Sequence, residues 1–168
     1  MKGLFTALIL SLGLLAATPA NASSGGHVGD TAPDFTLHDL DGRSVSLAGL
    51  RKSGYVLVIF WSTQCPICHH MLPDFKRAYR EYDGKGLTVA AVDIGLEDEN
   101  GVQAYALQYD LPYLVLNQDS KKQDLQLDYD LIGTPTIVLV GPDGKVAYRG
   151  HHLPDLRAWL GPRHQASN

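Results

Sequence analysis

The chain has 168 residues, of which 45% are hydrophobic, and its formal net charge at pH 7 is −4. This length suffices for one ordinary domain with one hydrophobic core, and we expect a single-domain monomer. The mildly acidic charge, with no Lys or Arg cluster beyond short pairs, argues against a nucleic-acid partner.

The N-terminus has the pattern of a secretory signal peptide. Lys2 precedes an apolar run from Leu4 to Ala17, and Ala20-Asn21-Ala22 forms a small-residue cleavage site. We therefore expect cleavage after Ala22 and a periplasmic mature protein. An uncleaved signal would instead act as a membrane anchor, although the apolar run is short for a span.

Composition divides the rest of the chain into three parts. Residues 23–31 are mostly Gly, Ser and polar types, which predicts a flexible lead-in. We expect the folded domain over residues 32–162 and a loose tail over residues 163–168.

The first predicted elements lead up to a cysteine pair. Residues 35–47 read as two short strands around Asp39-Leu40-Asp41-Gly42, which predicts an edge hairpin. The nearly continuous apolar run Tyr55–Trp61 is typical of a central strand that is buried on both faces. Proline is favoured at the first position of a helix, and after Pro66 apolar residues recur at helical spacing as far as Tyr82. These two signals predict a helix that begins at Pro66.

Strand and helix patterns continue to alternate. Residues 87–94 predict a second buried strand and residues 100–109 a helix, which together indicate a parallel βαβ unit. Residues 113–116 predict a short strand or loop, and residues 121–129 a short helix.

A hairpin over residues 136–148, with the turn Gly141-Pro142-Asp143-Gly144, precedes a last helix over residues 154–160. The predicted fold class is α/β, with a central mixed β-sheet flanked by helices and an N-terminal β-hairpin.

The two cysteines of the chain form the motif Cys65-Pro66-Ile67-Cys68. A disulfide scaffold would link distant segments, whereas this pair closes a loop too small to constrain much chain entropy. The pair therefore predicts chemistry, and the candidates are redox exchange, metal binding and haem attachment.

The position of the motif after a buried strand and at the start of a helix favours redox exchange. Partial positive charge at a helix start stabilises a thiolate. We predict that Cys65, the more exposed cysteine, is the nucleophile and that Cys68 is the resolving thiol. No cofactor is required, since the redox-active Cys65–Cys68 disulfide itself stores two electrons.

Two segments, Val58 to Cys68 and Gly133-Thr134-Pro135-Thr136, resemble the thioredoxin superfamily, and within it the exported TlpA/ResA-like reductases. The resemblance extends from about Val28 to Leu160. It implies that Pro135 is a cis-proline facing the disulfide and that the backbone of Thr134 pairs with an extended substrate segment. It also implies that Pro73 bends the active-site helix by removing an N–H donor.

Trp61, Gln64, Pro66 and Ile67 adjoin or belong to the motif and are the candidates for a substrate-facing surface. For Trp61 the alternative is a packed aromatic of the core. Gln64 departs from the pattern, because many relatives have Trp there.

The general base is open at this point. Thioredoxin has a buried Asp where this chain has Ile59, and ResA-like proteins have a proton-accepting Glu where it has Leu96. The nearby carboxylates Asp93 and Glu97 are therefore the candidates for the base.

The resemblance implies a reductase of exported protein disulfides, such as those of apocytochromes or copper-site proteins, recharged by a thiol protein that donates electrons from the membrane. A copper chaperone is an alternative, because Cys thiolates bind Cu(I) and His69, His70 and Met71 follow the pair. Successive helical residues point in different directions, however. The sequence also contains C-x-x-C-H, the haem-attachment motif, but a motif joined to a buried strand leaves haem little space.

Overall fold

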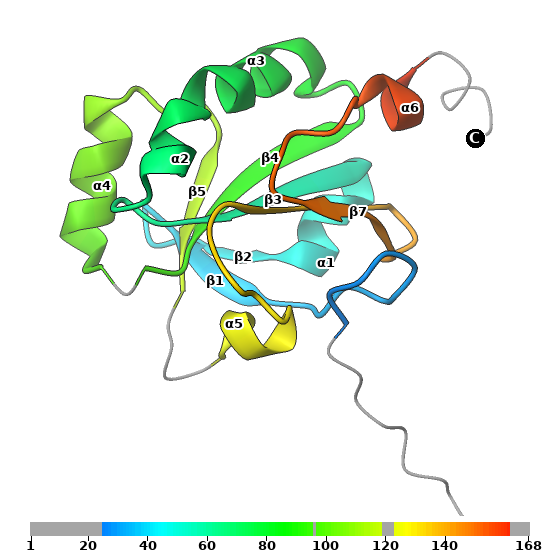
Figure 1. Ribbon diagram of the computed structural model, residues 1–168, viewed down its shortest axis with the longest axis horizontal. Helices are drawn as coiled ribbons and strands as arrows, with labels where there is room; N and C mark the ends of the chain where they lie inside the picture. The colour runs from blue at the N-terminus through cyan, green and yellow to red at the C-terminus, as the bar shows by residue number, and fades with distance from the viewer. Residues whose placement is uncertain (1–24, 96, 119–122, 162–168) are drawn as a thin grey trace, which may run out of the picture.

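The computed structural model describes residues 25–95, 97–118 and 123–161. Within these residues, seven strands form one sheet between two layers of helices (Figure 1). The strands are β1 (Thr36–Asp39), β2 (Ser44–Ser46), β3 (Tyr55–Trp61), β4 (Leu87–Asp93), β5 (Leu114–Asn117), β6 (Thr136–Val140) and β7 (Val146–Gly150). The helices are α1 (Leu47–Leu50), α2 (Pro66–His70), α3 (Leu72–Tyr82), α4 (Glu99–Gln108), α5 (Leu125–Asp128) and α6 (Arg157–Leu160), with a 3₁₀ turn η1 (Arg51–Ser53).

The sheet is mixed, which confirms the predicted fold class. Its strand order is β2-β1-β5-β4-β3-β6-β7. Strands β3, β4 and β5 run parallel, while β6, β7 and the edge hairpin β1–β2 are antiparallel to their neighbours. The parallel βαβ units place the carboxyl ends of β3, β4 and β5 at the same edge of the sheet.

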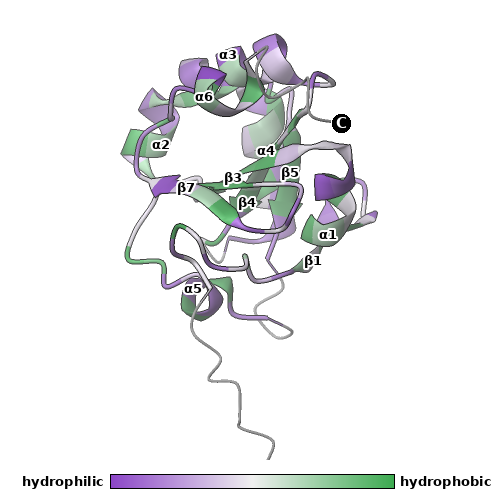
Figure 2. Ribbon diagram, turned by 90° about the vertical axis from the view of Figure 1, so that its right-hand side faces the viewer, coloured by the Kyte–Doolittle hydropathy of each residue, from purple (hydrophilic) through white to green (hydrophobic). Residues whose placement is uncertain are grey.

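Alternate side chains of the central strands enter two separate cores. Leu57, Ile59 and Trp61 point toward the layer formed by α2, α3, α4 and α6. Their neighbours Val56 and Val58 point to the opposite face, toward α1 and α5. Because helices cover both faces, β3 has no polar side (Figure 2), which explains its continuous apolar sequence.

The helix predicted to run from Pro66 to Tyr82 is divided at Met71 into α2 and α3. The N–H of Met71 still donates to the carbonyl of Ile67 at 3.1 Å. Pro73 then lacks the N–H that would continue the ladder, so the chain changes direction there. The interruption expected from Pro73 is therefore present.

Some segments differ from the sequence expectation. Helix α1 was not predicted; Ser46 caps it by accepting the N–H of Gly49 at 3.0 Å. The predicted helices at 121–129 and 154–160 are shorter in the structure, which gives α5 and α6, and residues 119–122 lie outside the described residues.

Residues 25–31 of the predicted lead-in lie along the last hairpin, where the N–H of Gly29 donates to Val146 at 2.9 Å. The predicted signal peptide and the tail lie outside the described residues. Among the described helices, none is long and apolar enough to cross a membrane.

Candidate active site

The two cysteines form a disulfide at the carboxyl end of β3, with their Cα atoms 5.2 Å apart. Cys65 is the N-cap of α2, and its Sγ accepts the N–H of Cys68 at 3.1 Å. The exposed fraction is 7% for Cys65 and 1% for Cys68. Cys65 is thus the more exposed cysteine, as predicted, while Cys68 faces the core.

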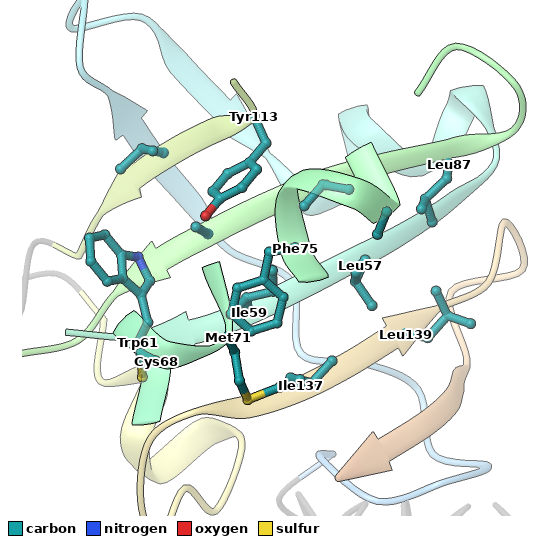
Figure 3. Packing of buried hydrophobic residues seen from close by; sticks show 14 of the residues in the cluster. Leu57, Ile59, Trp61, Cys68, Met71, Phe75, Leu87, Tyr113, Ile137 and Leu139 are labelled. Atoms are coloured by element: carbon teal, nitrogen blue, oxygen red, sulfur yellow. The ribbon is translucent and has the colours of Figure 1, made fainter. Parts of the chain in front are cut away.

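The residues predicted to face a substrate differ in their exposure to solvent. Gln64, Pro66 and Ile67 are exposed around the disulfide, and Ile67 retains 60% of its surface. Trp61 is only 3% exposed and packs against Tyr105 with ring centroids 5.1 Å apart. Figure 3 shows Trp61 and Cys68 at the same end of this core. Trp61 thus lies beneath the disulfide, whereas the other three form the surface around it.

The loop before β6 reaches the same end of the sheet. The Thr134–Pro135 bond is cis, as the resemblance implies. Thr136 pairs with Phe60 of β3, which brings Thr134 and Pro135 to the strand end that leads into the cysteine motif. His151 contacts the carbonyl of Pro135 through Nδ1 at 2.8 Å.

A cleft of about 300 Å³ runs beside this loop. Its lining residues come from the loop after β3, the β4 end, α5 and the loop before β6: Ser62, Ile94, Gly95, Gln126, Leu131, Ile132, Gly133 and Thr134.

The two candidate bases have different environments. Asp93 ends β4 and is 3% exposed; burial, and then the nearby charge of Glu97, raise the pKa of Asp93 to about 7. Burial also acts to raise the pKa of Glu97, but hydrogen bonds outweigh it and the net pKa is lowered. These bonds come mainly from Thr63, whose N–H and hydroxyl donate to Glu97 Oε1 at 3.1 and 2.6 Å.

Gly95 allows the Glu97 side chain to fold back toward the motif. A Cβ at Gly95 would lie 2.0 Å from Glu97 Oε2 and 2.5 Å from Cβ of Ser62. Only a residue without a side chain fits between these groups. Leu96, the position aligned with the ResA glutamate, lies outside the described residues.

The side chains next to the cysteine pair diverge. His69 Nδ1 lies 3.2 Å from the hydroxyl of Tyr105, and the His69 ring meets Tyr109 edge-on. Met71 is 9% exposed and packs in the core, where Figure 3 shows it next to Ile137. Among the described residues, no group of three or more His, Cys, Asp or Glu side chains is arranged to hold a metal ion.

Three residues of this region were not singled out from the sequence: Thr63, Asn117 and His151. The sequence did contain a signal that could have identified Asn117. It is the polar residue that ends the apolar run of β5, just as Asp93 ends the apolar run of β4. Thr63 and His151 gave none, because their partners, Glu97 and Pro135, are distant along the chain.

Comparison with known proteins agrees with this geometry. Residues 28–149 match the AhpC/TSA family. The thiol-disulfide oxidoreductase ResA of Bacillus subtilis is 32% identical over 119 residues, which are 70% of this chain and 64% of ResA. ResA of Geobacillus thermodenitrificans is 35% identical over 120 residues, 71% of this chain and 66% of the relative. The chain thus spans slightly less than two thirds of these relatives.

A solved structure gives the same result at the level of the fold. The thioredoxin domain of a thiol-disulfide oxidoreductase from Bacteroides vulgatus superposes with a TM-score of 0.70 at 30% identity, covering 79% of this chain and 94% of that domain. The chain therefore belongs to the AhpC/TSA family of thioredoxin-fold proteins, and over most of its length it is similar in sequence to ResA thiol-disulfide oxidoreductases.

Proposed function

We propose that the protein is a thiol-disulfide oxidoreductase that reduces disulfides of exported proteins. The observation that carries this proposal is the position of the Cys65–Cys68 disulfide, at the start of α2 and at the sheet end reached by the Thr134–Pro135 loop. Relatives and solved neighbours that carry the name thiol-disulfide oxidoreductase support it.

The reaction uses both sulfur atoms in turn. In the reduced protein, the Cys65 thiolate attacks one sulfur of a substrate disulfide, which forms a mixed disulfide and releases one substrate thiolate. Cys68 then loses its proton and attacks Cys65 Sγ. This step forms the Cys65–Cys68 disulfide and releases the second substrate thiolate, so two electrons pass from the protein to the substrate.

Of the two candidate bases, we assign Asp93 as the acceptor of the Cys68 proton. A base works best when its pKa lies near the operating pH, and the pKa of Asp93 is about 7. Asp93 pairs with Trp61 across β3 and β4, so its side chain points to the core that contains Cys68. Glu97, ionised and held by Thr63, raises the pKa of Asp93 through its charge and acts as a positioning residue.

The site requires no bound cofactor, because the dithiol carries the electrons. The N-terminal signal pattern supports a periplasmic location. In that compartment, the resemblance to exported TlpA/ResA-like reductases favours apocytochromes or copper-site proteins as substrates. A membrane protein with reactive thiols would return the oxidised protein to its dithiol form.

The test is the reduction potential of the purified protein in glutathione buffers. A value near that of thioredoxin, about −270 mV, would support a reductase, whereas a value near −120 mV would make the protein an oxidant. A Cys68→Ser variant should trap substrates as mixed disulfides through Cys65, and the matched Cys65→Ser variant should trap none. If the pair forms no reversible disulfide, the proposal fails and Cu(I) retention by the same thiols becomes the function to measure.

A further inference from the structure

Polar side chains gather in the core where β3, β4 and β5 end. Trp61, Asp93 and Asn117 are neighbours in register across these three parallel strands. Since paired residues of adjacent strands point to the same face, all three side chains point toward the layer of α2 and α4. Together with Glu97 they form what we call the strand-end cluster.

The strand-end cluster contains buried polar atoms without hydrogen bonds. Within the described residues, Trp61 Nε1, Asp93 Oδ1, Glu97 Oε2 and both amide atoms of Asn117 have no partner. Buried polar atoms are nearly always hydrogen-bonded, so several unpaired ones at one place need an explanation. Two residues earlier on the same three strands, the equivalent positions hold the buried apolar residues Ile59, Ala91 and Val115. Stability alone would favour apolar side chains at the strand ends as well.

The unpaired atoms are complementary around Asp93. Trp61 Nε1–H on one side and Asn117 Nδ2–H on the other are donors, and the carboxylates of Asp93 and Glu97 are acceptors. A protonated Asp93 can donate to Glu97, but an ionised Asp93 faces a like charge and needs donors. Trp61 and Asn117 flank Asp93 in the sheet register, so a side-chain rotation or a bridging water would let their neutral N–H groups supply these donors.

The titratable groups around Asp93 come from several elements. Glu97 lies before α4, Tyr105 belongs to α4 and packs on Trp61, and Cys68 belongs to α2. Tyr113 precedes β5 in the same core, and His69 of α2 contacts Tyr105. Burial raises the pKa of Tyr105, so its phenol stays neutral near pH 7. Glu97 therefore supplies the charge that opposes ionisation of Asp93.

We propose that Asn117 is a positioning residue of the exchange reaction, whose amide, with the Trp61 indole N–H, stabilises the Asp93 carboxylate that receives the Cys68 proton. This inference rests on the proposed function. In the resolving step, the proton moves from Cys68 Sγ to Asp93, and the new carboxyl group donates it in a hydrogen bond to Glu97. Asn117 then sets the pH range in which Asp93 is ionised and ready to accept.

The experiment isolates the resolving step with Ellman's reagent. The reduced protein attacks the reagent through Cys65 and releases one coloured thiolate; attack by Cys68 on the resulting mixed disulfide releases the second. Stopped-flow measurement of the second release from pH 5 to pH 9 gives the pH profile for the wild type, Asn117→Leu, Asn117→Ser and Asp93→Asn. Leucine matches the size of the amide without donors, while serine retains one.

For Asn117→Leu we expect a profile displaced upward by about one pH unit, which is about a tenfold slower release at pH 6.5, and an unchanged rate at the alkaline plateau. Asn117→Ser should recover most of the rate at pH 6.5. An undisplaced profile in Asn117→Leu, or a rate lowered equally at every pH, would overturn the inference while leaving Asp93 as the acceptor. A wild-type profile in Asp93→Asn would overturn both the inference and that acceptor, and absence of any second release would overturn the redox function itself.

Discussion

Thr63 binds Glu97 twice, through its backbone N–H and its hydroxyl, and both groups donate to the same carboxylate oxygen. The two residues are 34 positions apart, on the loops that follow β3 and β4. Because Thr63 stands two residues before Cys65, this pair couples the cysteine motif to the carboxylates at the end of β4.

The hydroxyl of Thr63 should control which of the two carboxylates is ionised. Thr63→Val keeps the shape and the backbone N–H but removes one donor, so the pKa of Glu97 should rise and that of Asp93 should fall. A hydrogen bond to a charged group contributes about 1.5–3 kcal/mol. Carboxyl ¹³C NMR titration measures both values. The matched variant Thr63→Ser should retain the wild-type order, and an unchanged titration in Thr63→Val would show that the backbone donor suffices.

Asp93 should make the folded protein less stable as the pH rises from 4 to 7. The pKa of Asp93 is about 7 in the fold and 3.8 without its environment, so the folded state holds a proton that the unfolded state has released. Its contribution to stability is fully present below pH 3.8 and is lost as the pH rises through 7, by at most about 4 kcal/mol.

The comparison is between the wild type and Asp93→Asn, whose amide does not titrate. Urea unfolding at pH 4.5, 6 and 8 should show the wild type losing stability relative to the variant at each step. Parallel stability curves would mean that Asp93 ionises as easily in the fold as in the unfolded chain.

The sequence predicted Asp93 and Glu97 as candidate bases but could not assign their separate roles. The strand over residues 55–61 and the cysteine pair were predictable, because a continuous apolar run and a two-residue spacing are local signals. The two carboxylates differ by features that no local pattern contains. Asp93 is enclosed by Trp61 and Asn117 from neighbouring strands, whereas Glu97 meets Thr63 across the site.

The same distinction between local and distant signals explains which features of the fold were not predicted. Helix α1 spans only Leu47–Leu50, which is too short to show a helical period. Asn117 lies beside Asp93 only because β5 pairs with β4, so its place at the strand-end cluster depends on sheet register. Pro73, in contrast, is a local signal, and the interruption between α2 and α3 follows from it.

Replacing Gly95 by alanine should disturb the carboxylates more than it disturbs the backbone. The added Cβ would collide with Glu97 Oε2 at 2.0 Å, so Glu97 must leave Thr63 or the loop must move. We expect a loss of about 1–3 kcal/mol in the free energy of unfolding, together with a raised pKa of Glu97.

The control for this variant is Gly101→Ala, in helix α4 of the same region. There the Cβ would meet only Asp98 Oδ1, at 3.3 Å. Alanine is favoured over glycine inside a helix by about 1 kcal/mol, so Gly101→Ala should be neutral or stabilising. Urea unfolding measures both variants, and equal effects would show that the close contact at Gly95 relaxes without cost.

Ile67 should distinguish protein substrates from small ones. Its side chain lies between the two cysteines in sequence and is 60% exposed beside a disulfide that is almost buried. A folded or extended protein substrate must cover this surface to reach Cys65, whereas a small disulfide reagent need not. For Ile67→Ser we therefore expect a rise in KM of about tenfold with a protein disulfide such as insulin, from roughly 1–2 kcal/mol of lost apolar contact.

The rate of Ile67→Ser with Ellman's reagent should stay at the wild-type value, because that reaction requires only the sulfur chemistry. Leu107→Ser provides the matched control, since Leu107 is 72% exposed but lies on α4 outside the motif. It should leave both reactions unchanged. If Ile67→Ser slows both substrates equally, Ile67 affects the reactivity of Cys65, and the surface that receives the protein substrate must be sought along the Thr134–Pro135 loop and the cleft beside it instead.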